Sequence, residues 1–147
     1  RLDLFTVRGE GAAQAALVEG DLRIPPAAMD VPLPPPPLFW ATLGVFRPGV
    51  GAELMGANAQ DDGSLLRYAL ADGRRMHFLV RGTRIEQVEL RVDGSVEEEV
   101  RLEWRPDGKV PAAARSRLMR EARELSTTLE RIEDAEPFSP GIWMPRG

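Results

Sequence analysis

The side chains that most often carry enzyme chemistry are few in this sequence. His77 is the sole histidine and the chain has no cysteine. The residues that a usual zinc site or a thiol nucleophile requires are therefore absent. A Ser–His–Asp triad would need His77 as its base, yet no nucleophile-elbow motif surrounds any serine. We therefore expect no catalytic residue and no metal ligand set.

Acidic residues gather at two places, and neither has the spacing of a known site. Glu97, Glu98 and Glu99 are consecutive, so on a strand their side chains alternate between faces and do not converge in a cleft. Asp61-Asp62-Gly63 resembles part of a calcium loop but lacks the other ligands and the closing glutamate. Since no glycine-rich phosphate loop is present either, we expect no cofactor and a non-enzymatic protein.

The composition is that of a globular protein. The 147 residues are 43% hydrophobic and 29% charged, with a net charge of −4, which suits a single domain (1–147) with its own core. The acidic balance argues against a nucleic-acid partner. No apolar run approaches the roughly 20 residues of a membrane-spanning helix.

Residues 65–104 carry the clearest structural pattern, an antiparallel β-meander. Apolar residues alternate with polar ones, as in strands with one buried face, and turn residues separate the runs at Asp72-Gly73, Gly82-Thr83 and Asp93-Gly94. The apolar positions are Leu66, Tyr68, Leu70, Met76, Phe78, Val80, Val88, Leu90, Val92, Val96, Val100, Leu102 and Trp104.

The alternation also predicts the register, because opposed residues of a hairpin share a face. A two-residue loop at Asp93-Gly94 would set Val88 opposite Glu99, whereas an odd loop sets Val88 opposite Val100 and Val92 opposite Val96. The same argument pairs Tyr68 and Val88 each with Phe78. We therefore expect three-residue or bulged turns.

The residues before the meander predict short elements. Strands are expected at 2–7, 12–18, 22–24 and 52–55, with a polar loop at 57–63. The run Pro32 to Pro37 is a stiff connector or a polyproline ligand of a partner. Residues 38–46, between prolines, predict a short helix that either packs on the sheet or lines a pocket for an apolar ligand.

Residues 112–134 are ambiguous. Leu118, Ala122, Leu125, Leu129 and Ile132 have helical spacing, although Leu125, Thr127 and Leu129 would also share one face of a strand. The tail at 137–145 reads as extended, and Phe138, Ile142 and Trp143 are expected to be buried, because they would otherwise form an exposed apolar patch.

The order of these pieces resembles a known family. The strand at 100–104, the turn Pro106-Asp107-Gly108, Val110-Pro111, "ELSTTLERIED" and "PFSPGIWMP" resemble the closing part of bacterial lipoprotein-carrier domains, the LolA/LolB-like superfamily. The resemblance covers most of the chain and implies an α+β, mostly β fold, in which a curved antiparallel sheet, an incomplete barrel, carries a short helix across its concave face. It favours strands over helix at 112–120 and 123–132.

The resemblance also implies a function and a location. The domain would be periplasmic and membrane-anchored, with its first strands and its anchor upstream of Arg1, and it would bind a lipid acyl chain or an apolar element of a partner. The alternative is a structural accessory subunit of a bacterial membrane protein complex. The expected apolar cavity is lined by Phe39, Trp40, Leu43, Phe46, Leu66, Tyr68, Met76, Phe78, Val88, Leu90 and Leu102.

Overall fold

The structure of the protein is a computed structural model. It describes residues 2–5, 11–18, 21–23, 34, 36–106, 108–130 and 137. The chain divides into two compact units, residues 1–36 with 132–147, and residues 37–131. The first unit holds a three-stranded antiparallel sheet of β1 (Leu2–Phe5), β2 (Gly11–Val18) and β3 (Asp21–Arg23). These strands confirm the elements expected there. The expected burial of Phe138, Ile142 and Trp143 concerns residues outside the described part of the chain.

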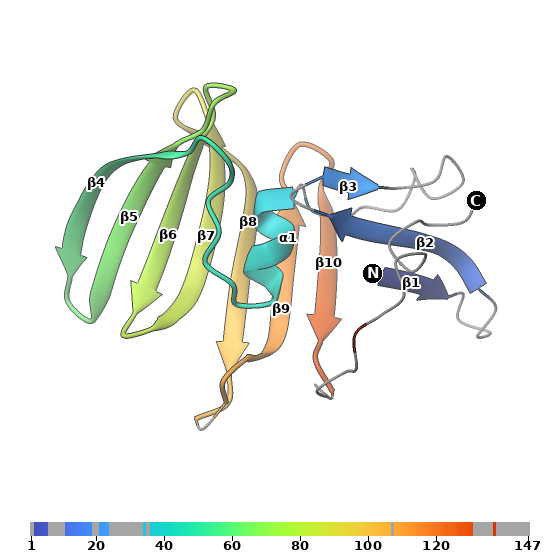
Figure 1. Ribbon diagram of the computed structural model, residues 1–147. Helices are drawn as coiled ribbons and strands as arrows, with labels where there is room; N and C mark the ends of the chain where they lie inside the picture. The colour runs from blue at the N-terminus through green and yellow to red at the C-terminus, as the bar shows by residue number, and fades with distance from the viewer. Residues whose placement is uncertain are drawn as a thin grey trace. The chain divides into compact units, whose positions relative to one another are not determined.

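The second unit is one antiparallel sheet whose seven strands follow each other in chain order (Figure 1). Its edges are formed by β4 and β10, and the sheet is not closed. The strands are β4 (Glu53–Gln60), β5 (Gly63–Ala69), β6 (Arg75–Arg81), β7 (Arg84–Val92), β8 (Ser95–Trp104), β9 (Pro111–Leu118) and β10 (Arg123–Thr128). The meander is confirmed, and so is the mostly β fold.

One helix, α1 (Pro36–Thr42), precedes this sheet. Pro36 and Pro37 occupy its first turn, where a missing amide hydrogen costs no helical bond. Gly44 ends it, with a φ of 72° and its amide donating to the Ala41 carbonyl at 2.8 Å. The helix is thus shorter than expected, and Val45 and Phe46 lie beyond it.

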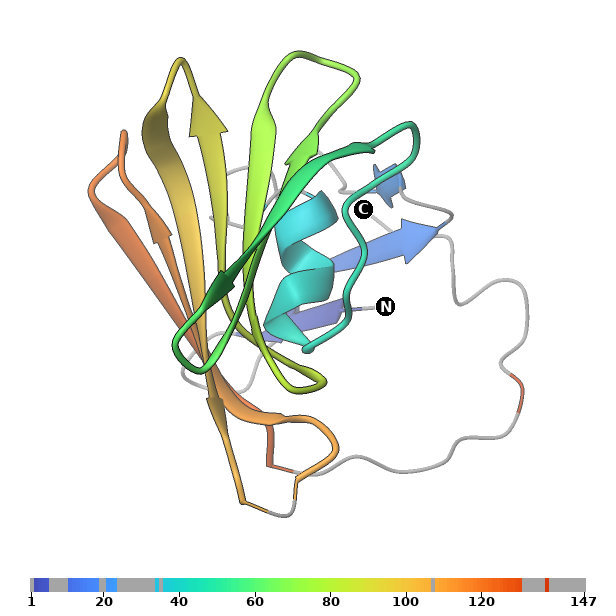
Figure 2. The ribbon, with the colours of Figure 1, turned by 90° about the vertical axis from the view of Figure 1, so that its left-hand side faces the viewer.

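The helix packs on the apolar face of the sheet (Figure 2). Leu38 and Ala41 of α1 are buried in one cluster with the inward side chains of β6, β7, β8 and β9. Trp104 closes this core at one end, and its indole nitrogen donates a hydrogen bond to the Ile85 carbonyl at 2.7 Å. The fully or nearly fully buried members are Leu38, Ala41, Met76, Phe78, Ile85, Val88, Leu90, Val100, Leu102 and Ala114.

The register confirms that apolar residues share one face, but the turns differ from the expectation. Asp93-Gly94 is a two-residue turn with Val92 paired to Ser95, so the expected Val92–Val96 pair is wrong. A β-bulge after Leu90 then shifts the register by one residue and brings Val88 opposite Val100. The one extra residue that the alternation requires between Val88 and Val100 therefore lies inside the strand and not in the turn.

The other hairpins behave in related ways. Gly82-Thr83 is also a two-residue turn, and a bulge after Leu79 allows Phe78 to pair with Val88 as expected. Phe78 pairs on its other side with Leu66, so the expected Tyr68–Phe78 pair is wrong. Tyr68 pairs with Met76 and stays on the predicted face, because a shift of two residues preserves the face.

Two segments of uncertain type are strands. Residues 57–60, expected as loop, belong to β4, which pairs with β5 across the turn Asp61-Asp62. An exposed edge strand of small and polar residues has no burial pattern to reveal it. Residues 111–118 and 123–128 form β9 and β10, as the family resemblance implied. β9 pairs with β8 and β10 pairs with β9, and this pairing outweighs their helical spacing.

Candidate functional site

The expected cavity residues lie on one face of the sheet or on the helix side of it. Cross-strand pairing forms a row through β4–β10, made of Ala57, Leu66, Phe78, Val88, Val100, Ser116 and Leu125. The next row contains Leu54, Tyr68, Met76, Leu90, Glu98, Leu118 and Arg123. The expected cavity residues that belong to the sheet therefore lie next to one another on one face.

The candidates differ in how much surface they leave open to a ligand. Met76, Phe78, Val88 and Leu90 are each 0% exposed and Leu102 is 8% exposed. Protein atoms already cover these side chains completely or almost completely. Partial exposure is left to Phe39, Trp40, Leu43, Leu66 and Tyr68, whereas Phe46 is 42% exposed.

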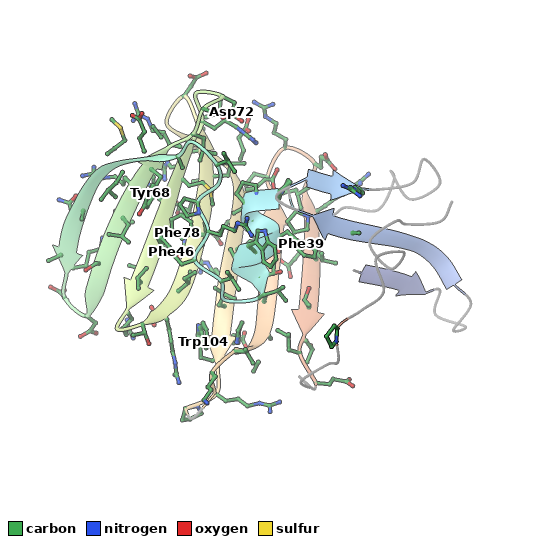
Figure 3. All side chains as sticks on the ribbon, viewed as in Figure 1. Phe39, Phe46, Tyr68, Asp72, Phe78 and Trp104 are labelled. Atoms are coloured by element: carbon green, nitrogen blue, oxygen red, sulfur yellow. The ribbon has the colours of Figure 1, made fainter. Side chains whose placement is uncertain are left out.

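Three aromatic rings meet where the chain leaves α1 (Figure 3). The Phe46 ring lies 4.5 Å from the Phe78 ring and 5.8 Å from the Tyr68 ring, centroid to centroid. Tyr68 and Phe78 also meet edge to face at 5.9 Å, an arrangement that aromatic pairs favour. Phe46 therefore covers part of the apolar face of the sheet at β5 and β6.

Next to these rings, exposed apolar side chains gather within residues 45–55. Of the seven large hydrophobic residues that are exposed in the described part of the chain, Val45, Phe46, Val50, Leu54 and Met55 belong to this segment. Leu54 pairs with Tyr68 across β4 and β5, so this apolar edge, as we call the five residues, adjoins the aromatic cluster. Sequence reasoning missed all of them except Phe46, although apolar residues in a glycine-rich segment (Gly44, Gly49, Gly51, Gly56) were a visible signal.

The opposite face of the sheet is polar. Arg67, His77, Glu89, Glu99 and Arg117 follow one another across β5–β9, so His77 lies on this polar face. Burial lowers the pKa of His77, and the positive charge of Arg91 lowers it further. His77 is therefore neutral at pH 7.

Glu99 is the one buried member of this row. It is only 6% exposed and accepts hydrogen bonds from Arg101 Nε at 2.7 Å and from Gln87 Nε2 at 3.2 Å. Gln87 also donates to Glu89 at 2.9 Å, and Glu89 accepts from Arg91 at 2.6 Å. These carboxylates are engaged in a structural network.

Two hollows are present away from the helix. One of about 290 Å³ lies on the polar face and is lined by Gln60, Leu65, His77, Leu79, Gln87, Glu89 and Arg91. The other, of about 370 Å³, lies at the ends of β4–β7 and is lined by Gln60, Asp61, Asp62, Gly63, Leu79, Val80, Arg81 and Glu86. Neither is lined by α1 or by the expected cavity residues.

Within the described ranges, no three His, Asp or Glu side chains are grouped as metal ligands would be. Among the same residues, no helix has the length and hydropathy that crossing a bilayer requires. The apolar edge beside the aromatic cluster is therefore the candidate functional site. Comparison with protein-family models, with curated proteins and with solved structures found no match.

Proposed function

We propose that this chain is a non-enzymatic, LolA/LolB-like domain of the bacterial envelope that binds an apolar ligand, either an acyl chain or an apolar element of a partner. The proposal rests on the sequence resemblance and on an unclosed antiparallel sheet with one helix packed on its apolar face. In the proposal the sheet curves around the helix as an incomplete barrel. The periplasmic, membrane-anchored location follows from the resemblance alone.

The observation that carries the proposal is the gathering of exposed hydrophobic residues at 45–55. Leu54 is 56% exposed and Val50 is 86% exposed, although apolar surface gains about 25 cal/mol per Å² when it leaves water. Exposed large apolar residues that gather in this way are typical of a binding site. The ligand is therefore placed beside β4 and the aromatic cluster, because the face under α1 is filled by side chains of the protein itself.

A fluorescent fatty-acid probe tests this proposal on the full chain. Leu54→Glu should weaken probe binding about tenfold or more, since burying a leucine side chain is worth about 1.5–3 kcal/mol. Met119→Glu is the matched control, because Met119 is 43% exposed at the β9–β10 turn, outside the apolar edge. If both variants bind the probe as tightly as the unmodified protein does, the binding site does not lie at the apolar edge.

A structural accessory subunit of a membrane complex is the second candidate. It is favoured by the filled core, in which Phe46 packs on Phe78 and four expected cavity residues are 0% exposed. In that case the apolar edge would contact a protein. Native mass spectrometry of the gently purified protein separates the two, because a lipid-sized mass supports the carrier and a bound subunit, with no probe binding, supports the accessory role.

A further inference from the structure

The strand β4 is one edge of the seven-stranded sheet, and among the described strands only β5 pairs with it (Figure 1). The outer side of an edge strand presents backbone amide and carbonyl groups that can pair with another strand. Proteins protect such edges with charged side chains, with proline or by keeping the strand short. β4 has eight residues, no proline and a single charge at Glu53. The other edge, β10, has six residues and begins with the exposed pair Arg123 and Glu124, so β4 is the less protected edge.

A β-bulge in β4 decides which strand fits this edge. Leu54 and Ala57 lie on the apolar face, while Glu53 and Asn58 lie on the polar face, and the bulge at 55–56 separates the two halves. A partner strand of regular spacing must leave one bulge residue without an opposite residue, as β5 does. A second copy of β4 carries the same bulge, so the two bulges can lie opposite each other.

Antiparallel pairing of two β4 strands about this bulge keeps every side chain on its own face. The pairs across the two-fold axis are Met55–Gly56, Leu54–Ala57 and Glu53–Asn58. Each pair joins residues of the same face and occurs twice, as a two-fold axis requires. Like charges do not oppose each other in this register. The sequence of β4 is therefore complementary to itself along residues 53–58.

A pair of opposite charges supports the same register. The Arg67 side chain lies along β4, because its Nη2 donates to Asn58 Oδ1 and would lie 3.2 Å from a Cβ at Gly56. Within the described ranges, no ion pair includes Arg67 or Glu53. Pairing of two copies sets Glu53 of one copy beside Asn58 of the other, and hence beside the Arg67 that bonds to that Asn58. The pairing therefore brings two unused opposite charges together, once on each side of the axis.

We propose that two copies of this chain pair through β4, antiparallel about the bulge, and so join two sheets into one. The inference rests on the proposed function, since it names a second copy as the partner that contacts the apolar edge. Leu54, which is 56% exposed, then lies at the junction. Because residues 53–58 alone make the contact, we expect an interface smaller than the standard one of roughly 1,600 Å² and a weak dimer.

Sedimentation of the full chain tests the dimer. The average mass should rise from monomer toward dimer between about 5 and 500 μM, the range of a weak complex. Glu53→Arg should weaken the dimer about tenfold, since it sets like charges side by side, and Arg67→Glu added to it should restore the dimer. Glu103→Arg makes the same charge change at an exposed carboxylate of β8 and should leave the dimer intact. A monomer throughout this range overturns the proposal, and so does a dimer that Glu53→Arg leaves unchanged.

Disulfide formation tests the register, because the chain has no cysteine of its own. Leu54→Cys and Ala57→Cys proteins, mixed and mildly oxidised, should crosslink, since opposed Cβ atoms lie about 4.5–5.5 Å apart, close to disulfide reach. Either variant alone should crosslink far less, because equal positions are offset by three residues, roughly 10 Å. A mixture of Ala57→Cys with Met119→Cys is the control for random collision. Crosslinking of the first mixture no faster than this control overturns the pairing through β4.

The fatty-acid probe separates this inference from the proposed function. It is titrated into the chain at a concentration at which sedimentation shows only monomer. Probe binding by a chain that never dimerises overturns the β4 pairing alone. A crosslinked dimer whose monomer binds no probe supports the pairing and contradicts the acyl chain as ligand.

Discussion

The Phe46 ring packs on the Phe78 ring with their centroids 4.5 Å apart. Phe46 belongs to the connection after α1 and is 42% exposed, whereas Phe78 lies in the central part of the sheet and is 0% exposed. The contact joins the candidate site to the core. A ligand that reached Phe78 would have to displace Phe46, which distinguishes binding at the surface from binding within the fold.

The two rings should differ in their contribution to stability. Phe78→Ala should lower the free energy of unfolding by about 3–5 kcal/mol, because it leaves a cavity in a packed core. Phe46→Ala should cost about 1–2 kcal/mol, since this ring is half exposed but loses two aromatic contacts. Urea denaturation measures both values. Equal costs would mean that Phe46 belongs to the core.

Gly44 should not tolerate a side chain. Its φ is 72°, and a Cβ there would lie 2.7 Å from Trp104 and 2.8 Å from Pro111. Gly44→Ala should therefore lower the free energy of unfolding by roughly 1–3 kcal/mol, because alanine is strained in the left-handed region. The clash with Trp104 and Pro111 should lower it further. Gly73→Ala is the matched control, because Gly73 has a φ of 86° with open space around it. Equal falls in melting temperature would show that Trp104 and Pro111 give way.

Glu99 should depend on its partners. Arg101→Ala removes the 2.7 Å hydrogen bond to a carboxylate that is 6% exposed, so it should cost about 1–3 kcal/mol. Arg105→Ala replaces an exposed arginine just after the end of β8 and should cost little. Thermal melts of the two variants test the difference, and a neutral Arg101→Ala would mean that Glu99 is solvated after all.

His77 should make the stability of the fold depend on pH. Burial and Arg91 lower the pKa of His77 below 6.5, so the unfolded chain binds a proton there more readily than the folded chain. Stability should therefore rise with pH from the folded pKa up to about 6.5. His77→Gln should remove this rise, most visibly in melting temperatures at pH 5 and 7.5. An unchanged pH profile would contradict the shift.

The sequence by itself determined the meander and its buried face, because alternation with period two reports directly which side chains leave water. It also required one odd residue in each of the two-residue hairpins at Gly82 and Asp93. Only the tertiary structure decided that this residue is a bulge in the strand, since a bulge and a longer turn satisfy the same parity.

The edges of the sheet could not be read in the same way. β4 is exposed along almost its whole length, so Ala57 and Asn58 carry no burial pattern. β9 becomes a strand by pairing with β8, and β10 by pairing with β9, despite the helical spacing of their apolar residues. The candidate site could be predicted from the sequence only in part. The aromatic residues were predicted as a group, but whether they enclose space depends on how side chains distant in sequence pack. That packing covers Phe78 with Phe46 and leaves Leu54 open.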